Sequence, residues 1–96
     1  MPIQAVWNDT VIAHSDRTVV VEGNHYFPRD DVDLSCLERS STTSTCPWKG
    51  EAHYYSVDVE GDVCQDGAWY YSDPKPEAEN IRDRIAFWNG VEVSEA

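Results

Sequence analysis

Two segments rich in aromatic and β-branched residues, 51–59 and 63–71, lie on either side of Gly61 and Asp62. Segments of this composition predict strands, and a Gly-Asp pair between them is typical of a two-residue hairpin turn. We therefore expect one long antiparallel hairpin over residues 51–71. A bulge at Gly67 would shift its register beyond that point.

The position of the turn determines which residues of the hairpin lie opposite one another. Because side chains alternate between the two faces of a strand, every second residue shares a surface. A turn at Gly61 and Asp62 places four side chains on one surface: Ala52, Tyr54, Trp69 and Tyr71. The expected cross-strand pairs are Tyr54–Trp69, His53–Tyr70 and Ala52–Tyr71.

The rest of the chain predicts further short strands. Val, Thr, Tyr and Trp are plentiful, whereas Leu occurs at only two positions, and turn residues separate the β-rich runs. We expect strands over 3–7, 10–15, 18–22 and 25–27, and a second hairpin that joins 85–88 to 91–93.

Two segments favour short helical turns. Carboxylates at the front of residues 29–38 and a proline at the start of 76–79 are typical of helix N-termini. Residues 40–45 predict a polar loop, and the tail from Ser94 is expected to fray. The 96-residue chain therefore predicts a single domain, 1–96, that is mainly β: a small bent sheet or barrel with one or two helical turns.

The chain has seven basic and eighteen acidic residues, which gives a net charge of −11. This charge repels phosphate backbones and anionic lipids, so we expect binding to neither nucleic acid nor membranes. No stretch approaches the roughly 18 apolar residues of a membrane span, and residues 1–4 do not begin a signal peptide. We therefore expect a cytoplasmic protein, either a monomer or a homodimer.

Cys36, Cys46 and Cys64 are an odd number of cysteines and contain no C-x-x-C pair. A structural zinc site of the usual pattern therefore has no ligands, and we expect neither a metal nor a cofactor. In a reducing compartment all three are predicted to be free thiols.

The bend from Cys46 to Gly50 holds the most varied chemistry in the chain. Cys46 is the candidate catalytic nucleophile, because Lys49 or His53 could lower the pKa of its thiol. The alternative, which we favour, is that Cys46 packs as a small apolar group, as free cysteines commonly do.

A ligand site is the second interpretation of this bend. Lys49 could contact an anionic group, and His53 lies a few residues further along. Aromatic side chains could form the wall of the pocket: Trp48, Tyr54, Trp69 and Tyr71. The alternatives are a surface ion pair for Lys49 and a place in the core for the rings.

The leading hypothesis is thus a small binding domain that holds a small-molecule ligand, anionic or aromatic, near the Cys46–Lys49 bend. One rival is a thiol-dependent enzyme that uses Cys46 in redox or transfer chemistry. The other is a protein-interaction module with an exposed aromatic patch.

Several motifs follow one another in a recognisable order: Ile12-Ala13-His14-Ser15, Tyr26-Phe27-Pro28, Cys46-Pro47-Trp48-Lys49-Gly50-Glu51-Ala52, Ala68-Trp69-Tyr70-Tyr71 and Ile85-Ala86-Phe87. Over nearly its whole length the chain resembles the bacterial and fungal family labelled domain of unknown function 427. The Cys-Pro-x-Lys-Gly-x-Ala block is the most specific part of the resemblance.

The resemblance implies a compact, bent β-structure similar to the β-tent fold, which methionine sulfoxide reductase B and several zinc-bearing binding domains share. This chain departs from those proteins because it lacks their paired C-x-x-C ligands. The family is sometimes labelled nucleotidyltransferase-like, and such enzymes need clustered carboxylates for Mg²⁺ and a Gly-Ser phosphate loop. Asp31 and Asp33 have a suitable spacing, but no Gly-Ser element precedes them, so the sequence does not predict nucleotidyl transfer.

Overall fold

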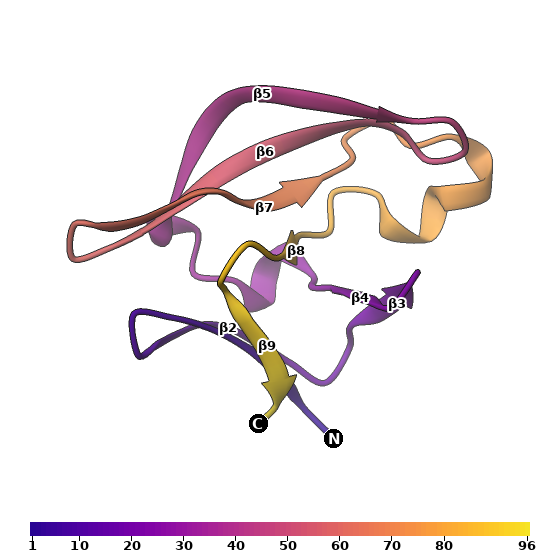
Figure 1. The fold of residues 1–96 in the computed structure, drawn as a ribbon. Helices are drawn as coiled ribbons and strands as arrows, with labels where there is room; N and C mark the ends of the chain where they lie inside the picture. The colour runs from indigo at the N-terminus through magenta and orange to yellow at the C-terminus, as the bar shows by residue number, and fades with distance from the viewer.

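Three antiparallel sheets, bent over one another, make up the fold in a computed structural model that describes residues 1–96. The largest sheet has the order β5-β6-β7-β8 and lies above the other two in the view of Figure 1. Its strands are β5 (Leu37–Cys46), β6 (Gly50–Val59), β7 (Asp62–Tyr70) and β8 (Ala86–Phe87).

A three-stranded sheet and a two-stranded sheet lie below the large sheet (Figure 1). The first has the order β2-β1-β9 and the second pairs β3 with β4. Their strands are β1 (Ile3–Trp7), β2 (Thr10–Ser15), β9 (Glu92–Glu95), β3 (Val19–Val21) and β4 (Asn24–Tyr26). Three short 3-10 segments connect them: η1 (Arg29–Asp31), η2 (Leu34–Cys36) and η3 (Pro76–Ile81).

The prediction of a mainly β domain with short helical turns is therefore confirmed, in its bent-sheet form. The barrel alternative is wrong, because β5 at one edge of the large sheet has no partner beyond β6. None of the three helical segments has the length or the apolar composition that a membrane-spanning helix requires.

Backbone hydrogen bonds between Phe27 and Ile85 join the β3-β4 sheet to the large one. The Phe27 N–H donates to the Ile85 carbonyl at 2.7 Å, and the Ile85 N–H returns a bond to Phe27 at 2.9 Å. Tyr26 and Phe27, being neighbours in an extended segment, point to opposite sides. Phe27 packs edge-on against Phe87 in the larger core cluster, and Tyr26 belongs to a second cluster with Tyr71.

The long hairpin has the predicted pairs around Tyr54, but its turn and the register next to the turn differ from the prediction. The turn lies at Glu60 and Gly61, both with positive φ, and Val57 pairs with Cys64. Residues 65–67 then lie opposite the single residue Ser56, and this bulge shifts the register by two. The pairs Tyr54–Trp69 and His53–Tyr70 are thereby confirmed.

The Ala52–Tyr71 pair is wrong, because β7 ends at Tyr70 and Tyr71 forms an isolated bridge with Arg82. Both side chains are nevertheless buried in the second core cluster. The bulge itself requires a small residue, since a Cβ at Gly67 would lie 2.6 Å from Cys64 Sγ.

Three further expectations are wrong. Residues 40–45 belong to strand β5, because an exposed edge strand accepts Ser and Thr on both faces and Thr is β-branched. The segments 85–88 and 91–93 do not form a hairpin, since β8 pairs with β7 and β9 crosses to β1. The tail from Ser94 is paired, because β9 extends to Glu95 and the Ala96 N–H donates to the Pro2 carbonyl at 3.0 Å.

Candidate functional site

Lys49 lies in the tight turn between β5 and β6. Cys46, the last residue of β5, pairs with Gly50, the first residue of β6, so the loop between them holds only three residues. Gly50 has φ +111°, and its α-carbon packs against residues 73–75, where a Cβ would lie 3.4 Å from the Asp73 carbonyl. The Lys75 N–H donates to the Lys49 carbonyl at 2.9 Å, which ties the turn to the segment before η3.

The Lys49 side chain folds inward and is only 9% exposed. Its ammonium forms an ion pair with Glu22, whose own side chain is 53% exposed, from the turn between β3 and β4. The Nζ atom also lies 5.3 Å from the centre of the Trp48 ring and 5.8 Å from that of Tyr71. Burial lowers the pKa of Lys49, but the hydrogen bond with Glu22 and the neighbouring phenols raise it above its ordinary value, so Lys49 is charged at neutral pH.

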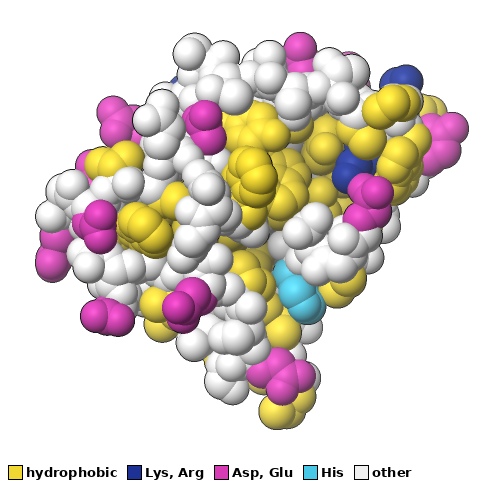
Figure 2. All heavy atoms as spheres, viewed as in Figure 1, with side chains coloured by type: hydrophobic (Ala, Val, Ile, Leu, Met, Phe, Trp, Pro, Cys, Tyr) yellow, Lys and Arg dark blue, Asp and Glu magenta, His cyan; other side chains and the backbone are white.

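Lys49 forms one end of a hollow of about 210 Å³. Its other lining residues are aromatic: Tyr54, Trp69, Tyr71 and Trp88. Figure 2 shows hydrophobic side chains gathered below the large sheet, with a basic side chain set among them and an acidic one beside it. We call this space the Lys49 hollow.

The Trp69 ring is held in place from two sides. Its Nε1 donates to the Tyr26 hydroxyl at 3.2 Å, and the two rings meet edge to face at 6.1 Å. On the other side, Trp88 meets Trp69 edge to face at 6.0 Å and is itself 49% exposed. The wall of the hollow is therefore fixed by contacts on the side of the core, where Trp69 lies, and exposed to solvent on the side of Trp88.

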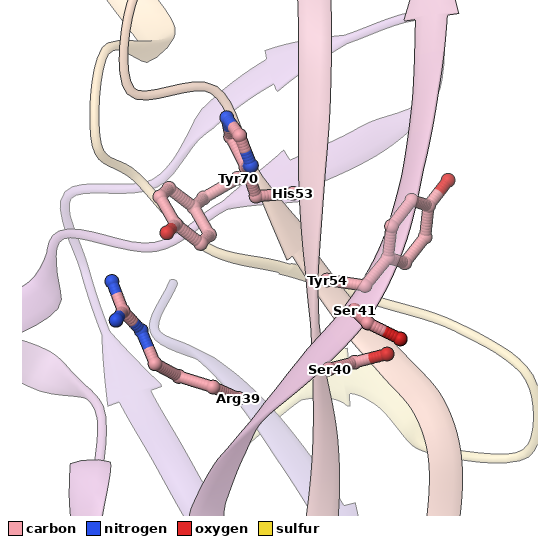
Figure 3. A pocket seen from close by; sticks show the side chains of 6 residues that line it. All are labelled: Arg39, Ser40, Ser41, His53, Tyr54 and Tyr70. Carbon is pink, nitrogen blue, oxygen red and sulfur yellow. The ribbon is translucent and has the colours of Figure 1, made fainter.

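The structure brings together four of the predicted ligand residues: Lys49, Tyr54, Trp69 and Tyr71. Trp48 lies beside the Lys49 ammonium and is 39% exposed. His53 does not line the Lys49 hollow. It lines a second hollow together with Tyr70 and with Tyr54, which lines both hollows (Figure 3).

Sequence reasoning did not identify Glu22, Tyr26 or Trp88 as parts of this site. Glu22 is 27 residues from Lys49 in the chain, and no local pattern reports such a contact. The sequence predicts Trp88 at the end of a strand, but its role in the site depends on how β8 pairs with β7.

Cys46, the candidate nucleophile, is half-buried and packs against the second core cluster, which contains Tyr26 and Tyr71. None of the three cysteines is disulfide-bonded, and no hydrogen bond reaches Cys46 Sγ. The role of Cys46 in catalysis stays a prediction.

The two aspartates considered for metal binding have other partners. Asp31 forms an ion pair with Arg17 at 3.2 Å, and Asp33 caps η2 by accepting hydrogen bonds from the Ser35 hydroxyl and N–H. These hydrogen bonds from Ser35 lower the pKa of Asp33. Nowhere in the chain do three His, Cys, Asp or Glu side chains converge as a metal site would require.

Tyr71 provides a test of how deeply the Lys49 hollow is set into the protein. Burial raises the pKa of Tyr71 to about 12 from the ordinary 10.0, although the charge of Lys49 acts in the opposite direction. The folded chain therefore holds this proton more tightly than the unfolded chain. Stability should fall between about pH 10 and pH 12, by roughly 2 kcal/mol from this residue.

The change Tyr71→Phe removes this titration. We expect urea unfolding at a series of alkaline pH values to show a flatter decline for the variant than for the wild type. Equal declines in the two proteins would show that Tyr71 ionises as an exposed phenol does.

Comparison with known proteins adds a family. The family described as Domain of unknown function (DUF427) matches residues 1–95, which is nearly the whole chain. No curated protein matches the sequence. The match confirms the resemblance seen in the motifs around the Cys46–Lys49 bend, and the chain belongs to the DUF427 family.

Proposed function

We propose that this domain binds a small aromatic molecule that carries a carboxylate or a similar anionic group, in the Lys49 hollow. The observation that carries the proposal is a buried ammonium at one end of a hollow whose other lining residues are all aromatic. Ligand sites commonly combine such apolar walls with one fixed polar group. The rings would hold the aromatic part, and Lys49 would contact the anion.

Glu22 is the partner of Lys49 that the anionic group of a ligand would have to replace. Its carboxylate is half-exposed and comes from a two-residue turn in which both Glu22 and Gly23 have positive φ. A buried ammonium without a partner would be strongly unfavourable, and Glu22 supplies the negative charge that compensates Lys49. An incoming carboxylate would take over that contact and release Glu22 to water.

The first prediction concerns Lys49. In Lys49→Met the length and apolar stem of the side chain are kept while the charge is lost. Benzoate should bind about tenfold more weakly to the variant, because one charge-assisted hydrogen bond is removed. Benzamide, which has the same ring and no charge, should be affected much less.

Binding can be measured by tryptophan fluorescence and by NMR titration. Lys75→Met is the matched control, because Lys75 adjoins the same turn and does not line the hollow. The proposal would be wrong if Lys49→Met and Lys75→Met bound benzoate equally well, or if neither benzoate nor benzamide shifted the resonances of Trp69 and Trp88.

A second prediction concerns Glu22. The change Glu22→Gln removes the competing carboxylate and keeps the shape of the side chain. Benzoate should then bind roughly threefold to tenfold more tightly than to the wild type, whereas the affinity for benzamide should stay the same. Weaker binding of benzoate to Glu22→Gln would mean that Glu22 supports the ligand and does not compete with it.

A further inference from the structure

A second hollow, of about 370 Å³, lies where β5 separates from β6. Arg39 pairs with Tyr55 and Thr43 pairs with His53, so three residues of β5 lie opposite Tyr54 alone. The side chains around this gap come from three strands: Arg39, Ser40 and Ser41 from β5, His53 and Tyr54 from β6, and Tyr70 from β7. In Figure 3 the Arg39 guanidinium extends toward the Tyr70 ring, with His53 beside that ring, while Tyr54 points away.

Arg39 differs from every other basic side chain of the protein. Each of the others has a polar partner within the chain, as shown by Arg17–Asp31, Lys49–Glu22, Arg82–Glu79, Arg29–Tyr55, Arg84–Arg17 and Lys75–Pro47. Arg39 makes neither an ion pair nor a side-chain hydrogen bond, although the chain has eighteen carboxylates. Its five N–H groups are therefore free to bind a planar or tetrahedral oxyanion.

On the side of the hollow that Arg39 approaches, His53 and Tyr70 belong to a row of three rings that continues to Tyr55. His53 lies 5.5 Å from Tyr70, and Tyr70 lies 5.1 Å from Tyr55, with planes 22° apart in the second pair. Arg29 lies over two of these rings, with its Cζ atom 4.6 Å from the centre of the Tyr70 ring, and it donates to the Tyr55 hydroxyl at 3.1 Å. Arg29 thus fixes the rings and adds a second positive charge to this side of the sheet.

The carboxylate of Glu51, at the edge of this row, is exposed. Glu51 lies 3.5 Å from the His53 Nε2 atom and its side chain is 59% exposed, so the contact is weak and easily exchanged. The net charge of −11 opposes anions at long range, but salt screens that repulsion beyond about 8 Å at physiological ionic strength. Hydrogen bonds from Arg39 to an anion in direct contact would persist under those conditions.

We infer that this second hollow binds the oxyanion group of a small molecule, a phosphate or a carboxylate, with Arg39 as the principal ligand. The Tyr70 hydroxyl and the His53 ring lie beside the same space and supply further polar contacts. This site is separate from the Lys49 hollow: the two share only Tyr54 in their linings. The inference therefore does not depend on the proposed function.

The test is an NMR titration of the ¹⁵N-labelled protein with inorganic phosphate at constant ionic strength. We expect the side-chain Nε–H signal of Arg39, the ring nitrogen signals of His53 and the backbone N–H signal of Tyr70 to shift in a saturable way. In Arg39→Gln the affinity should fall about tenfold, which is the loss of one charge-assisted hydrogen bond. Arg17→Gln is the matched control, since it removes the same charge from an exposed position in the loop between β2 and β3.

Phosphate and acetate, titrated separately, distinguish the two kinds of oxyanion: saturable shifts at Arg39 with either one support the site and identify the group. Tyr70→Phe, which keeps the ring stack, should weaken phosphate binding less than Arg39→Gln does. Equal losses in Arg39→Gln and Arg17→Gln would overturn the inference, because they would show a response to net charge alone. Shifts that rise linearly with the concentration of both anions, without saturation, would overturn it as well. Shifts that occur only around Lys49 would also overturn it.

Discussion

The ion pair between Lys49 and Glu22 is the contact on which the arrangement of the site depends. A lysine ammonium that is 9% exposed needs a partner, because an isolated charge in such a place costs several kcal/mol. The partner comes from the turn of the small β3-β4 sheet, so this turn must lie against the β5-β6 turn. The ion pair thereby fixes the position of Tyr26, at the end of β4, beside Trp69 of the large sheet.

Two interruptions of the large sheet determine which side chains line each hollow. The bulge at 65–67 shifts β7 by two residues and sets Trp69 opposite Tyr54. The separation of β5 from β6 after Arg39 opens the second hollow on the other edge of Tyr54. Because β6 is paired on both sides, it is the rigid element that holds the two hollows apart.

The parts of the fold that depend on neighbouring residues, namely short strands and tight turns, could be predicted from the sequence. The strands 3–7 and 10–15 were placed at their observed ends, and Pro47 and Gly50 indicated the bend that holds Lys49. The polar strand β5 was missed because an edge strand exposed on both faces shows no alternation of hydrophobic residues. Glu22 has its role because it contacts Lys49, which is distant in the sequence, and Arg39 has its role because no side chain pairs with it. No spacing in the sequence predicts the contact of Glu22 or the missing partner of Arg39.

The buried state of Lys49 is the central claim, and the ammonium group can be observed directly. A ¹⁵N–¹H spectrum of the lysine side chains, recorded near neutral pH, contains two candidates, Lys49 and Lys75. We predict a slowly exchanging Lys49 ammonium signal with cross-relaxation to the rings of Trp48 and Tyr71, and no such signal from Lys75. If the Lys49 ammonium exchanged with water as fast as that of Lys75, the ion pair would not be buried, and the account of the Lys49 hollow would be contradicted.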